Sequence, residues 1–512
     1  MDPSGISQPG RATAISFGLK RGEHMTLLIG LDVGTTNIGA IAVELAPKVR
    51  LLASVMIPNS ASYTTAHDDA IGRAELDLTR LFPLTLKALS QLAQQLGPRA
   101  KQVAVIGITG QQHGLALLGA GNVPLAPAIT WQDRRTAEPA ADGQTPLAQF
   151  IERAGGLEAF SNMGCGPATG YLGPSLFWHK QQHLLPPQPA QACLIPDAVT
   201  AYLTGSPPCT DPTDAGSTAL YDLTSGDWAW PVIRRLGLPA EILAPVRPTG
   251  SLAGGLRADL ADVCGLPQNT PIAAALGDNQ ASFLGSVRQP GQSLLLNVGT
   301  GAQCSALITD FQRLNELDTR AFPGGRFLMV GAGLFGGRSY AYLQNLFQQV
   351  GKMLYSIDDD RELYERMNQL AAAVPAGCAG LRCSPFFTGT RVDPSVRASF
   401  SGISPDNLTP GHLTRALLEG MAEAFYTFAQ RMSPIIGVRS VLIGAGNGIR
   451  RNPVFANILA QRWGLPLTQP IWEEEGAVGA ALCAAVAIGA VPDWAAASAL
   501  VSDRLTATGI ES

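Results

Sequence analysis

Leu31-Asp32-Val33-Gly34-Thr35-Thr36 is the stretch that decides the fold, because a close echo of it, Leu296-Asn297-Val298-Gly299-Thr300-Gly301, recurs about half the chain later. Each copy ends an apolar run that has the composition of a strand. A polar residue, a spacer and then Gly-Thr indicate a hairpin whose glycine allows a tight turn, so that N–H groups and hydroxyls can converge on phosphate oxygens. Two copies predict two related domains, each with one such hairpin.

The first copy adds a carboxylate to this turn. Asp32 stands at the strand end, where it could hold a hydrated Mg²⁺ beside phosphate oxygens bound by Gly34, Thr35 and Thr36. An ordinary β-turn with a turn-tolerant Asp explains this copy equally well when it is taken alone. The echo at residues 297–301 favours the phosphate interpretation.

The rest of the chain alternates strand-like and helix-like stretches, which is typical of an α/β fold. Strand-like runs cover residues 27–31, 103–108, 293–298 and 441–443, and helix-like stretches cover residues 78–95, 410–432 and 452–463. In the last helix Asn452 suits the N-cap, Pro453 the first turn and Gly464 the stop.

A chain of 512 residues is too long for one ordinary core, so two large domains are expected. The Pro- and Gly-containing stretch from 245 to 271 suggests the boundary, which we place between residues 262 and 263. The predicted domains are therefore 25–262 and 263–505, preceded by a disordered extension over residues 1–24.

Composition argues against nucleic-acid and membrane partners. Charged residues make up 15% of the chain, the net charge is −4, and no basic block of the kind that follows a phosphate backbone is present. The longest apolar run, residues 476–491, is shorter than the roughly 20 residues of a membrane span and reads as a buried helix packed on a sheet.

The N-terminal stretch and the cysteines point to a cytoplasmic protein. Residues 1–24 are polar and lack the apolar segment of a secretion signal. The eight cysteines are scattered, without metal-type clustering or the density of a disulfide scaffold, and are expected to be reduced and mostly buried.

A second candidate site is Gly277-Asp278-Asn279, which follows the short apolar run 272–275. A carboxylate there could accept the proton of an attacking hydroxyl, the one proton transfer that phosphorylation of an alcohol requires. Taken alone, Asp278 suits a helix cap better than a base.

Two further clusters could bind small molecules. Gln112 and His113, with Asp133 after Trp131, offer mixed donors, acceptors and a ring face that suit a polyhydroxylated ligand, although His113 taken alone fits a core histidine slightly better. The glycine-rich run 444–448 would let a flat base approach the backbone, but such runs are common in turns.

The order of these motifs resembles the FGGY carbohydrate kinase family from Met25 to about Ala490, including the C-terminal pattern over residues 398–416. The resemblance implies two actin-like (ribonuclease H-like) domains with a catalytic cleft between them, ATP as co-substrate and Mg²⁺. It makes Asp278 the general base and Asp32 the metal ligand. The residues that it assigns to the sugar are Gln112, His113, Asp133, Asp278 and Asn279. Those that it assigns to ATP are Gly34, Thr35, Thr36, Gly299, Thr300, Gly336, Gly337, Gly446, Asn447 and Asn452.

Within this family, the segments around Trp178, Arg391 and His412 look most like sedoheptulokinases, which implies phosphorylation of sedoheptulose to sedoheptulose 7-phosphate. Xylulose or another pentulose or polyol is the alternative substrate, because Gln112-His113-Gly114 and Gly277-Asp278-Asn279 are also similar to xylulokinase segments. Many family members carry Lys where this chain has Ser175. This departure leaves open the assignment of a substrate by general resemblance to the family.

A different class of function has to be weighed, since actin-like folds also serve as non-catalytic nucleotide- or sugar-sensing proteins. A regulator would need an added DNA-binding module, which the short N-terminal segment cannot supply. Asp278, which a degenerate kinase would have lost, is present. We therefore expect an enzyme with a small sugar and ATP as partners, and a homodimer is compatible with the sequence.

Overall fold

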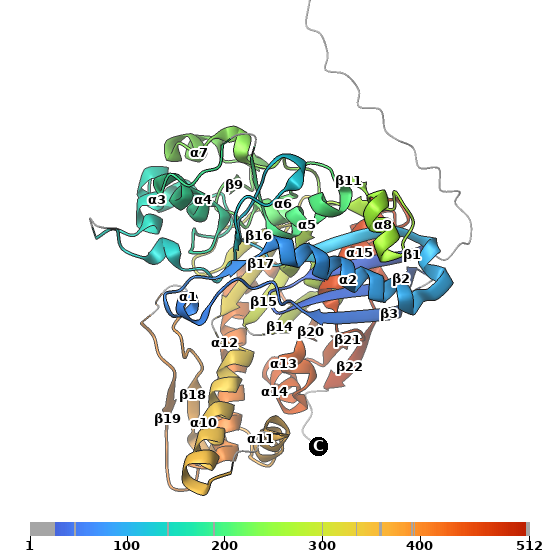
Figure 1. Ribbon diagram of the computed structural model, residues 1–512. Coiled ribbons are helices and arrows are strands. Elements are labelled where there is room, and N and C mark those ends of the chain that lie inside the picture. Colours follow the sequence, from blue (N-terminus) through green and yellow to red (C-terminus); the bar gives the residue numbers. More distant parts are fainter. Residues whose placement is uncertain are drawn as a thin grey trace, which may run out of the picture.

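The computed structural model describes residues 26–45, 48–140, 143–187, 190–299, 301–333, 335–357, 361–390, 393 and 395–507. Within these ranges the chain forms two seven-stranded sheets, with further small two-stranded sheets around them (Figure 1). The predicted extension over residues 1–24 lies outside the described residues.

The first sheet has the order β11-β12-β5-β1-β2-β3, with β13 also paired to β5. Strands β1 and β2 form an antiparallel hairpin, and β5 lies parallel to β1 on its other side. The strands are β1 (Thr26–Val33), β2 (Asn37–Leu45), β3 (Val49–Pro58), β5 (Val103–Gly110), β11 (Leu252–Gly255), β12 (Pro271–Ala273) and β13 (Leu276–Gly277).

The second sheet repeats this plan in the order β16-β17-β15-β14-β20-β21-β22. Here β14 and β15 form the antiparallel hairpin, and β20 lies parallel to β14. The strands are β14 (Ser293–Val298), β15 (Ala302–Ile308), β16 (Asp318–Phe322), β17 (Arg326–Gly333), β20 (Val441–Ala445), β21 (Leu467–Pro470) and β22 (Asp503–Ala507). The two Gly-Thr copies of the sequence therefore lie at equivalent turns of two α/β domains.

The chain passes from the first sheet to the second between Gly277 and Ser293, later than the boundary predicted between residues 262 and 263. The reason is that β12 and β13 return to the free edge of β5 before the chain leaves the first domain. Such a return depends on long-range pairing, which the Pro and Gly content of the stretch does not reveal.

The helices follow the predicted stretches closely. Helix α2 (Leu78–Leu96) covers the first sheet, while α12 (Pro410–Ile436) and α14 (Pro453–Trp463) pack in the core of the second domain. The predicted cap of α14 is confirmed, because Asn452 Oδ1 accepts a hydrogen bond from the N–H of Phe455 at 2.9 Å and Gly464 ends the helix with a φ of 63°.

The remaining helices are α1 (Ala66–Ala70), α3 (Pro146–Ala154), α4 (Leu172–Gln181), α5 (Ile195–Thr204), α6 (Pro212–Ala215), α7 (Trp230–Leu236), α8 (Ala258–Cys264), α9 (Asp278–Ser286), α10 (Gly337–Tyr355), α11 (Leu363–Ala372), α13 (Asn447–Arg450), α15 (Glu475–Ala487) and α16 (Trp494–Ala499). The small sheets pair β4 (Glu75–Leu76) with β7 (Ala128–Ile129), β6 (Ala116–Leu118) with β8 (Gln191–Cys193), β9 (Tyr221–Asp222) with β10 (Asp227–Trp228), and β18 (Arg382–Ser384) with β19 (Ser399–Ser401).

Helices α9 and α15 fill the space between the two sheets, and apolar residues of both sheets share one core with them. Figure 1 shows α15, from the red C-terminal end of the chain, beside the blue strands of the first sheet. The backbones approach so closely that a Cβ on Gly30 would lie 1.8 Å from the carbonyl oxygen of Ala477, and one on Gly479 1.8 Å from that of Ala281. Only glycine permits this contact. The predicted buried helix is confirmed over Glu475–Ala487 and ends before residue 491.

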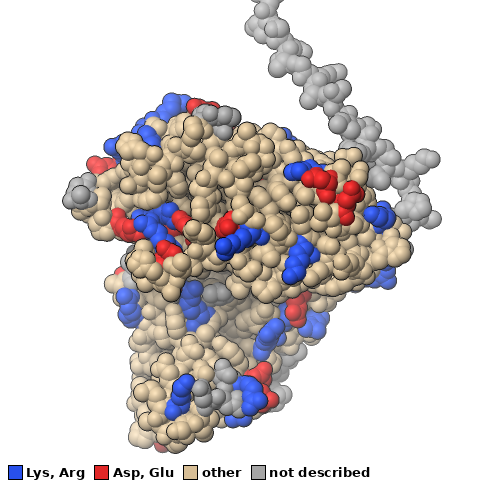
Figure 2. Space-filling model, viewed as in Figure 1, with Lys and Arg blue, Asp and Glu red and all other residues tan. Residues whose placement is uncertain are grey.

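The surface and the cysteines agree with the composition. In the view of Figure 2, basic and acidic side chains are interspersed, and a hollow separates the upper and lower parts of the molecule. All eight cysteines are buried thiols. Across the described ranges, none of the helices combines the length and apolar character needed to cross a membrane.

The contact between α15 and β5 yields a stability prediction. A Cβ on Gly107 would lie 1.9 Å from the carbonyl oxygen of Ala480, a backbone atom that no rotamer change can move. We expect Gly107→Ala to cost about 1–3 kcal/mol or more, the usual cost of overpacking a core. Gly291→Ala, where the added Cβ meets nothing within 4 Å, is the matched control. Calorimetric scans at one heating rate should show a lower Tm for Gly107→Ala alone, and equal Tm values would contradict the close packing.

Candidate active site

The carboxylates of Asp32 and Asp278 flank the C-terminal end of strand β5. Asp32 lies on β1 in register with Thr109 of β5, and Gly277, directly before Asp278, lies on β13 on the other side of β5. The hydroxyl of Thr109 donates to the carbonyl oxygen of Leu276 at 2.7 Å and thereby fastens β13 to this edge. Parallel pairing thus brings together two carboxylates that are far apart in the sequence.

Asp32 lies in a strongly acidic environment. Burial raises its pKa to about 7, and the carboxylates of Asp278, Glu474 and Glu475 contribute to the rise. A Cβ on Gly476 would lie 2.8 Å from Asp32 Oδ2, so the first turn of α15 approaches this carboxylate directly. A group in such surroundings gains from a nearby cation.

Asp278 occupies the first position of α9, with Gly277 as the N-cap, so Asp278 is not itself the cap. Its side chain is exposed to the cleft. The position between the two domains nevertheless reduces its hydration and raises its pKa to about 6, while the Arg320 guanidinium acts in the opposite direction. The carboxylate is therefore largely ionised at neutral pH and can accept a proton.

The first hairpin turn, Gly34 to Thr36, is held from two sides. The Asn59 side chain donates to the carbonyl oxygen of Gly34 at 2.8 Å, and the indole N–H of Trp131 donates to Thr35 Oγ1 at 3.1 Å. Thr36 is exposed at the tip of the turn. The Trp131 contact links this turn to the wall of the cavity described below.

The second hairpin turn lies against the start of α10. Gly336, with a φ of 144°, would place a Cβ 2.6 Å from the carbonyl carbon of Gly301. The N–H of Gly337 donates to the carbonyl oxygen of Gly299 at 3.0 Å. These glycines therefore lie together, and Thr300 lies outside the described residues.

The glycine-rich turn after β20 joins the same region. Gly446 has a φ of 80°, and a Cβ there would lie 2.5 Å from the carbonyl oxygen of Val298 at the end of β14. Asn447 follows at the start of α13 and is exposed, whereas the Asn452 side chain is buried as the cap of α14. Gly446 thus lies against the end of β14, and Asn447 follows it directly.

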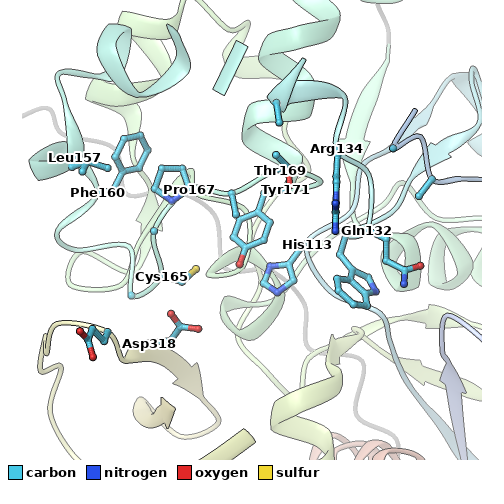
Figure 3. Close-up of a pocket in the computed structure, with 18 of the residues that line it drawn as sticks. His113, Gln132, Arg134, Leu157, Phe160, Cys165, Pro167, Thr169, Tyr171 and Asp318 are labelled. Carbon is cyan, nitrogen blue, oxygen red and sulfur yellow. The ribbon is translucent and has the colours of Figure 1, made fainter. Parts of the chain in front are cut away.

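A cavity of about 1330 Å³ is lined by residues of both domains, among them His113, which follows β5, and Trp131, which contacts the first hairpin turn. The first domain supplies most of its wall, and the second supplies residues 311, 313–319 and 338. Figure 3 shows His113 and Tyr171 at the middle of the wall. In the same view the more apolar side chains Leu157, Phe160 and Pro167 lie to the left, and the polar side chains Gln132 and Arg134 lie to the right.

His113 is fixed in orientation. Its ring stacks on Tyr171 with centroids 4.0 Å apart and planes 7° apart. Its Nδ1 lies 2.8 Å from the carbonyl oxygen of Ser217, which requires the proton on Nδ1. The backbone of His113 has a φ of 74°, so the ring is directed to the cavity by a left-handed turn.

The other sugar residues expected from the sequence do not line this cavity. Asp133 is buried, forms an ion pair with Arg135 at 2.8 Å and accepts the N–H of Ala74 at 2.8 Å. Gln112 is buried as well, and its amide donates to the carbonyl oxygen of Thr213 at 2.9 Å. In the neighbourhood of Asp133, the cavity is lined instead by Trp131, Gln132 and Arg134.

Asn279 lies behind Asp278 and is also buried, with its amide donating to Gln303 Oε1. Its direct contact with a sugar stays a prediction, as do those of Gln112 and Asp133. The arrangement around Asp278 therefore consists of an exposed carboxylate backed by buried polar side chains.

Several residues of the site were not anticipated. Glu474 and Glu475 begin the predicted buried helix, but nothing local in the sequence connects them with Asp32. Thr213, at the start of α6, accepts the N–H of Gly277, the residue before Asp278, and donates its hydroxyl proton to Asp211. Asp211-Pro212-Thr213-Asp214 has the pattern of a helix N-terminus, which is the only local indication that these residues offer.

Comparisons with known proteins agree with this geometry. The model of the N-terminal domain of the FGGY family of carbohydrate kinases matches residues 27–285, and that of the C-terminal domain matches residues 300–488. Autoinducer-2 kinases from Yersinia enterocolitica (serotype O:8 / biotype 1B) and Escherichia coli K12 are each 27% identical to the chain. The matches cover 90% of the chain and 86% of the Yersinia protein, and 91% of the chain and 87% of the E. coli protein.

Solved structures show the same architecture. Xylulose kinase from Rhodospirillum rubrum superposes with a TM-score of 0.79 at 26% identity, over 93% of each chain. Plasmodium falciparum glycerol kinase with ADP superposes with a TM-score of 0.76 at 18% identity, over 93% of this chain and 92% of that one, a likeness of fold alone. The predicted pair of actin-like α/β domains is confirmed.

Both domain models match in order along the chain. The relatives named above act on different small molecules, so they support the kinase class more strongly than any one substrate. The chain belongs to the FGGY family of carbohydrate kinases.

Proposed function

We propose that this kinase transfers the γ-phosphoryl group of ATP to a primary hydroxyl of sedoheptulose, giving sedoheptulose 7-phosphate. The observation that carries the proposal is the position of Asp278, an exposed carboxylate at the end of β5, on the other side of that strand from Asp32 and the turn that follows it. An acceptor hydroxyl in the cavity and a phosphoryl group at the turns would meet at this carboxylate. The non-catalytic alternative is set aside because the family is one of carbohydrate kinases.

Asp278 would act as the general base. Its carboxylate takes the proton of the hydroxyl as the oxygen attacks the γ-phosphorus in line with the departing oxygen of ADP. A pKa of about 6 suits this task, because the group is ionised near neutral pH yet retains affinity for a proton.

Backbone groups would bind the phosphates of ATP, the phosphoryl donor. The turn from Gly34 to Thr36 and the contact between Gly301 and Gly336 offer N–H groups without bulky side chains, so phosphate oxygens can come close. Gly446 and Asn447 would lie at the nucleoside part of ATP, beside the end of β14. Developing charge on the transferred group is then met by oriented dipoles in a site that excludes water.

The carboxylates fit a divalent cation such as Mg²⁺. Across the described ranges, no group of three His, Cys, Asp or Glu side chains is arranged to hold a metal alone. This agrees with the usual binding of Mg²⁺ by one or two carboxylates together with waters and phosphates. Asp32, whose pKa is raised among Asp278, Glu474 and Glu475, is the residue that would hold it. When bound, the cation would neutralise phosphate oxygens.

The segments around Trp178 and His412 that look like sedoheptulokinases support a heptulose. Two other acceptors have specific support: autoinducer-2, from the names of the relatives that match about 90% of the chain, and xylulose, from a solved relative at 26% identity. A cytoplasmic location and a homodimer stay predictions.

Replacing the base should stop catalysis without preventing ATP binding. Asp278→Asn keeps the shape of the side chain but cannot accept the proton, so we expect kcat to fall about 10² to 10⁴ fold. Asp262→Asn, on an exposed surface of α8, is the control. Coupled ADP-release assays measure kcat, and calorimetry measures ATP affinity. A variant that keeps more than about a third of wild-type kcat would remove Asp278 from the mechanism.

Replacing Asp32, the proposed metal ligand, should change the Mg²⁺ requirement of the enzyme. With Asp32→Ala we expect a much higher Mg²⁺ concentration for half-maximal activity and nearly normal sugar affinity, because the carboxylate faces the donor side. Mg²⁺ titrations of kcat and calorimetric titrations with sugar separate the two. Lost sugar affinity with an unchanged Mg²⁺ requirement would assign Asp32 another role.

The substrate assignment can be tested with a panel of acceptors. Sedoheptulose should give a kcat/KM about tenfold or more above those of xylulose, ribulose, glycerol, gluconate and autoinducer-2. A shorter acceptor leaves polar partners in the site unpaired, at about 1–3 kcal/mol each. Equal or better use of xylulose or autoinducer-2 would overturn the choice of sugar and leave the kinase class intact.

A further inference from the structure

A short buried helix lies behind the candidate base. Helix α6 (Pro212–Ala215) is capped by Asp211, whose Oδ1 accepts the N–H of Asp214 at 2.9 Å. Pro212 supplies the fixed φ that suits a first helical position. Asp211 and Thr213 are at most 2% exposed, so their polar groups are satisfied by protein and not by bulk water.

The carboxylate of Asp211 accepts two short hydrogen bonds. The hydroxyl of Thr213 donates to Oδ1 at 2.6 Å, and the hydroxyl of Thr249 donates to Oδ2 at 2.6 Å. An ionised carboxylate can only accept, so each hydroxyl commits its single proton to Asp211. The oxygen of Thr213 therefore presents only lone pairs to its remaining neighbours.

That oxygen accepts the N–H of Gly277 at 2.8 Å. Gly277 is the N-cap of α9 and the residue directly before Asp278. The backbone of Thr213 contributes as well, because its carbonyl oxygen accepts from the Gln112 amide at 2.9 Å and from the Gln280 amide at 3.5 Å. Thr213 thus bonds to Gly277, directly before Asp278, and to Gln280, two residues after it.

We propose that Thr213, with its proton direction fixed by Asp211, is a positioning residue that sets the place of the Asp278 carboxylate in the cleft. The chain of contacts runs from Asp211 through the Thr213 hydroxyl to the N–H of Gly277. This inference rests on the proposed role of Asp278 as general base.

The strength of the network comes from its charge and its burial. Hydrogen bonds to a carboxylate are shorter and about twice as strong as neutral ones. Burial raises the pKa of Asp211 to about 6, so it is mainly ionised at neutral pH and keeps both hydroxyls as donors. Loss of the Thr213 oxygen would leave the N–H of Gly277 buried without a partner, and the peptide before Asp278 would have to rotate.

Thr213→Val removes the hydroxyl at nearly constant shape, and Thr213→Ser retains it. We expect Val to lower kcat about 10 to 100 fold, since displacement of a reacting group by about 1 Å costs on the order of 10² in rate. KM for ATP and sugar should stay within about threefold of wild type, and Ser should restore kcat to within about threefold. These assays use the sugar that gives the highest kcat/KM in the panel described above.

Thr200→Val is the matched control. Thr200 is a buried threonine of α5 whose hydroxyl donates to the carbonyl oxygen of Pro196 at 2.9 Å. A structural role alone would give both Val variants the same loss of Tm and the same small loss of kcat. A Thr213→Val enzyme with wild-type kcat, or a Ser variant as impaired as Val, would overturn the proposal.

Combination with Asp278→Asn shows whether Thr213 acts through the base. If it does, Thr213→Val should lower the residual rate of the Asp278→Asn enzyme by less than about threefold, because the group that it positions is already inactive. Full additivity would overturn the proposal. An Asp278→Asn enzyme that keeps its activity contradicts the proposed function, whereas an inactive one beside a normal Thr213→Val enzyme contradicts only this inference.

Asp211→Ala provides a second variant if Thr213→Val does not fold. Without the carboxylate the Thr213 hydroxyl loses the acceptor that fixes its proton, so kcat should fall at least about threefold, with normal ATP affinity. Unchanged kcat in this variant would overturn the proposal as well.

Discussion

The backbone contact between α15 and its neighbours is the constraint on which the rest of the structure depends. Helix α15 comes from the end of the chain, yet it lies against β1 and β5 of the first sheet and against α9. At Gly30, Gly107, Gly285 and Gly479, a backbone oxygen of the neighbouring segment occupies the space that a Cβ would fill. Because both sheets share the core around these helices, the relative position of the two domains is set there.

This packing also concentrates negative charge. The start of α15 brings Glu474 and Glu475 to the strand end that holds Asp32, and β13 brings Asp278. Within the described ranges, Glu475 is paired with Arg450 at 2.5 Å, but that pairing leaves the environment acidic enough to raise the pKa of Asp32 to about 7. An acidic cleft favours cations and ligands that carry a bound cation, and it disfavours a polyanion without one.

Local patterns in the sequence were enough to predict the elements that are stabilised locally. The Gly-Thr echo predicted the two hairpins, and Asn452, Pro453 and Gly464 predicted both ends of α14. The family's motif order predicted the kinase class.

Contacts between distant segments were not predictable in the same way. The return of β12 and β13 to β5 moved the domain boundary, because strand pairing is decided by partners far along the chain. Asp133 has the residue type of a sugar ligand, yet Arg135 and Ala74 occupy its carboxylate. The contacts of Thr213 follow from a buried arrangement that no spacing reveals.

The attachment of Asp278 to the first sheet has a consequence for the order of events in a catalytic cycle. Strand β13 pairs with β5, and His113 lies a few residues beyond β5, so Asp278 and much of the cavity wall are attached to the first sheet. The turns around Gly301, Gly336 and Gly446 belong to the other domain. In the proposed mechanism an acceptor alcohol would therefore be aligned with Asp278 before any nucleotide arrives, and motion between the domains would have a single task, the delivery of the phosphoryl donor to a hydroxyl already in place.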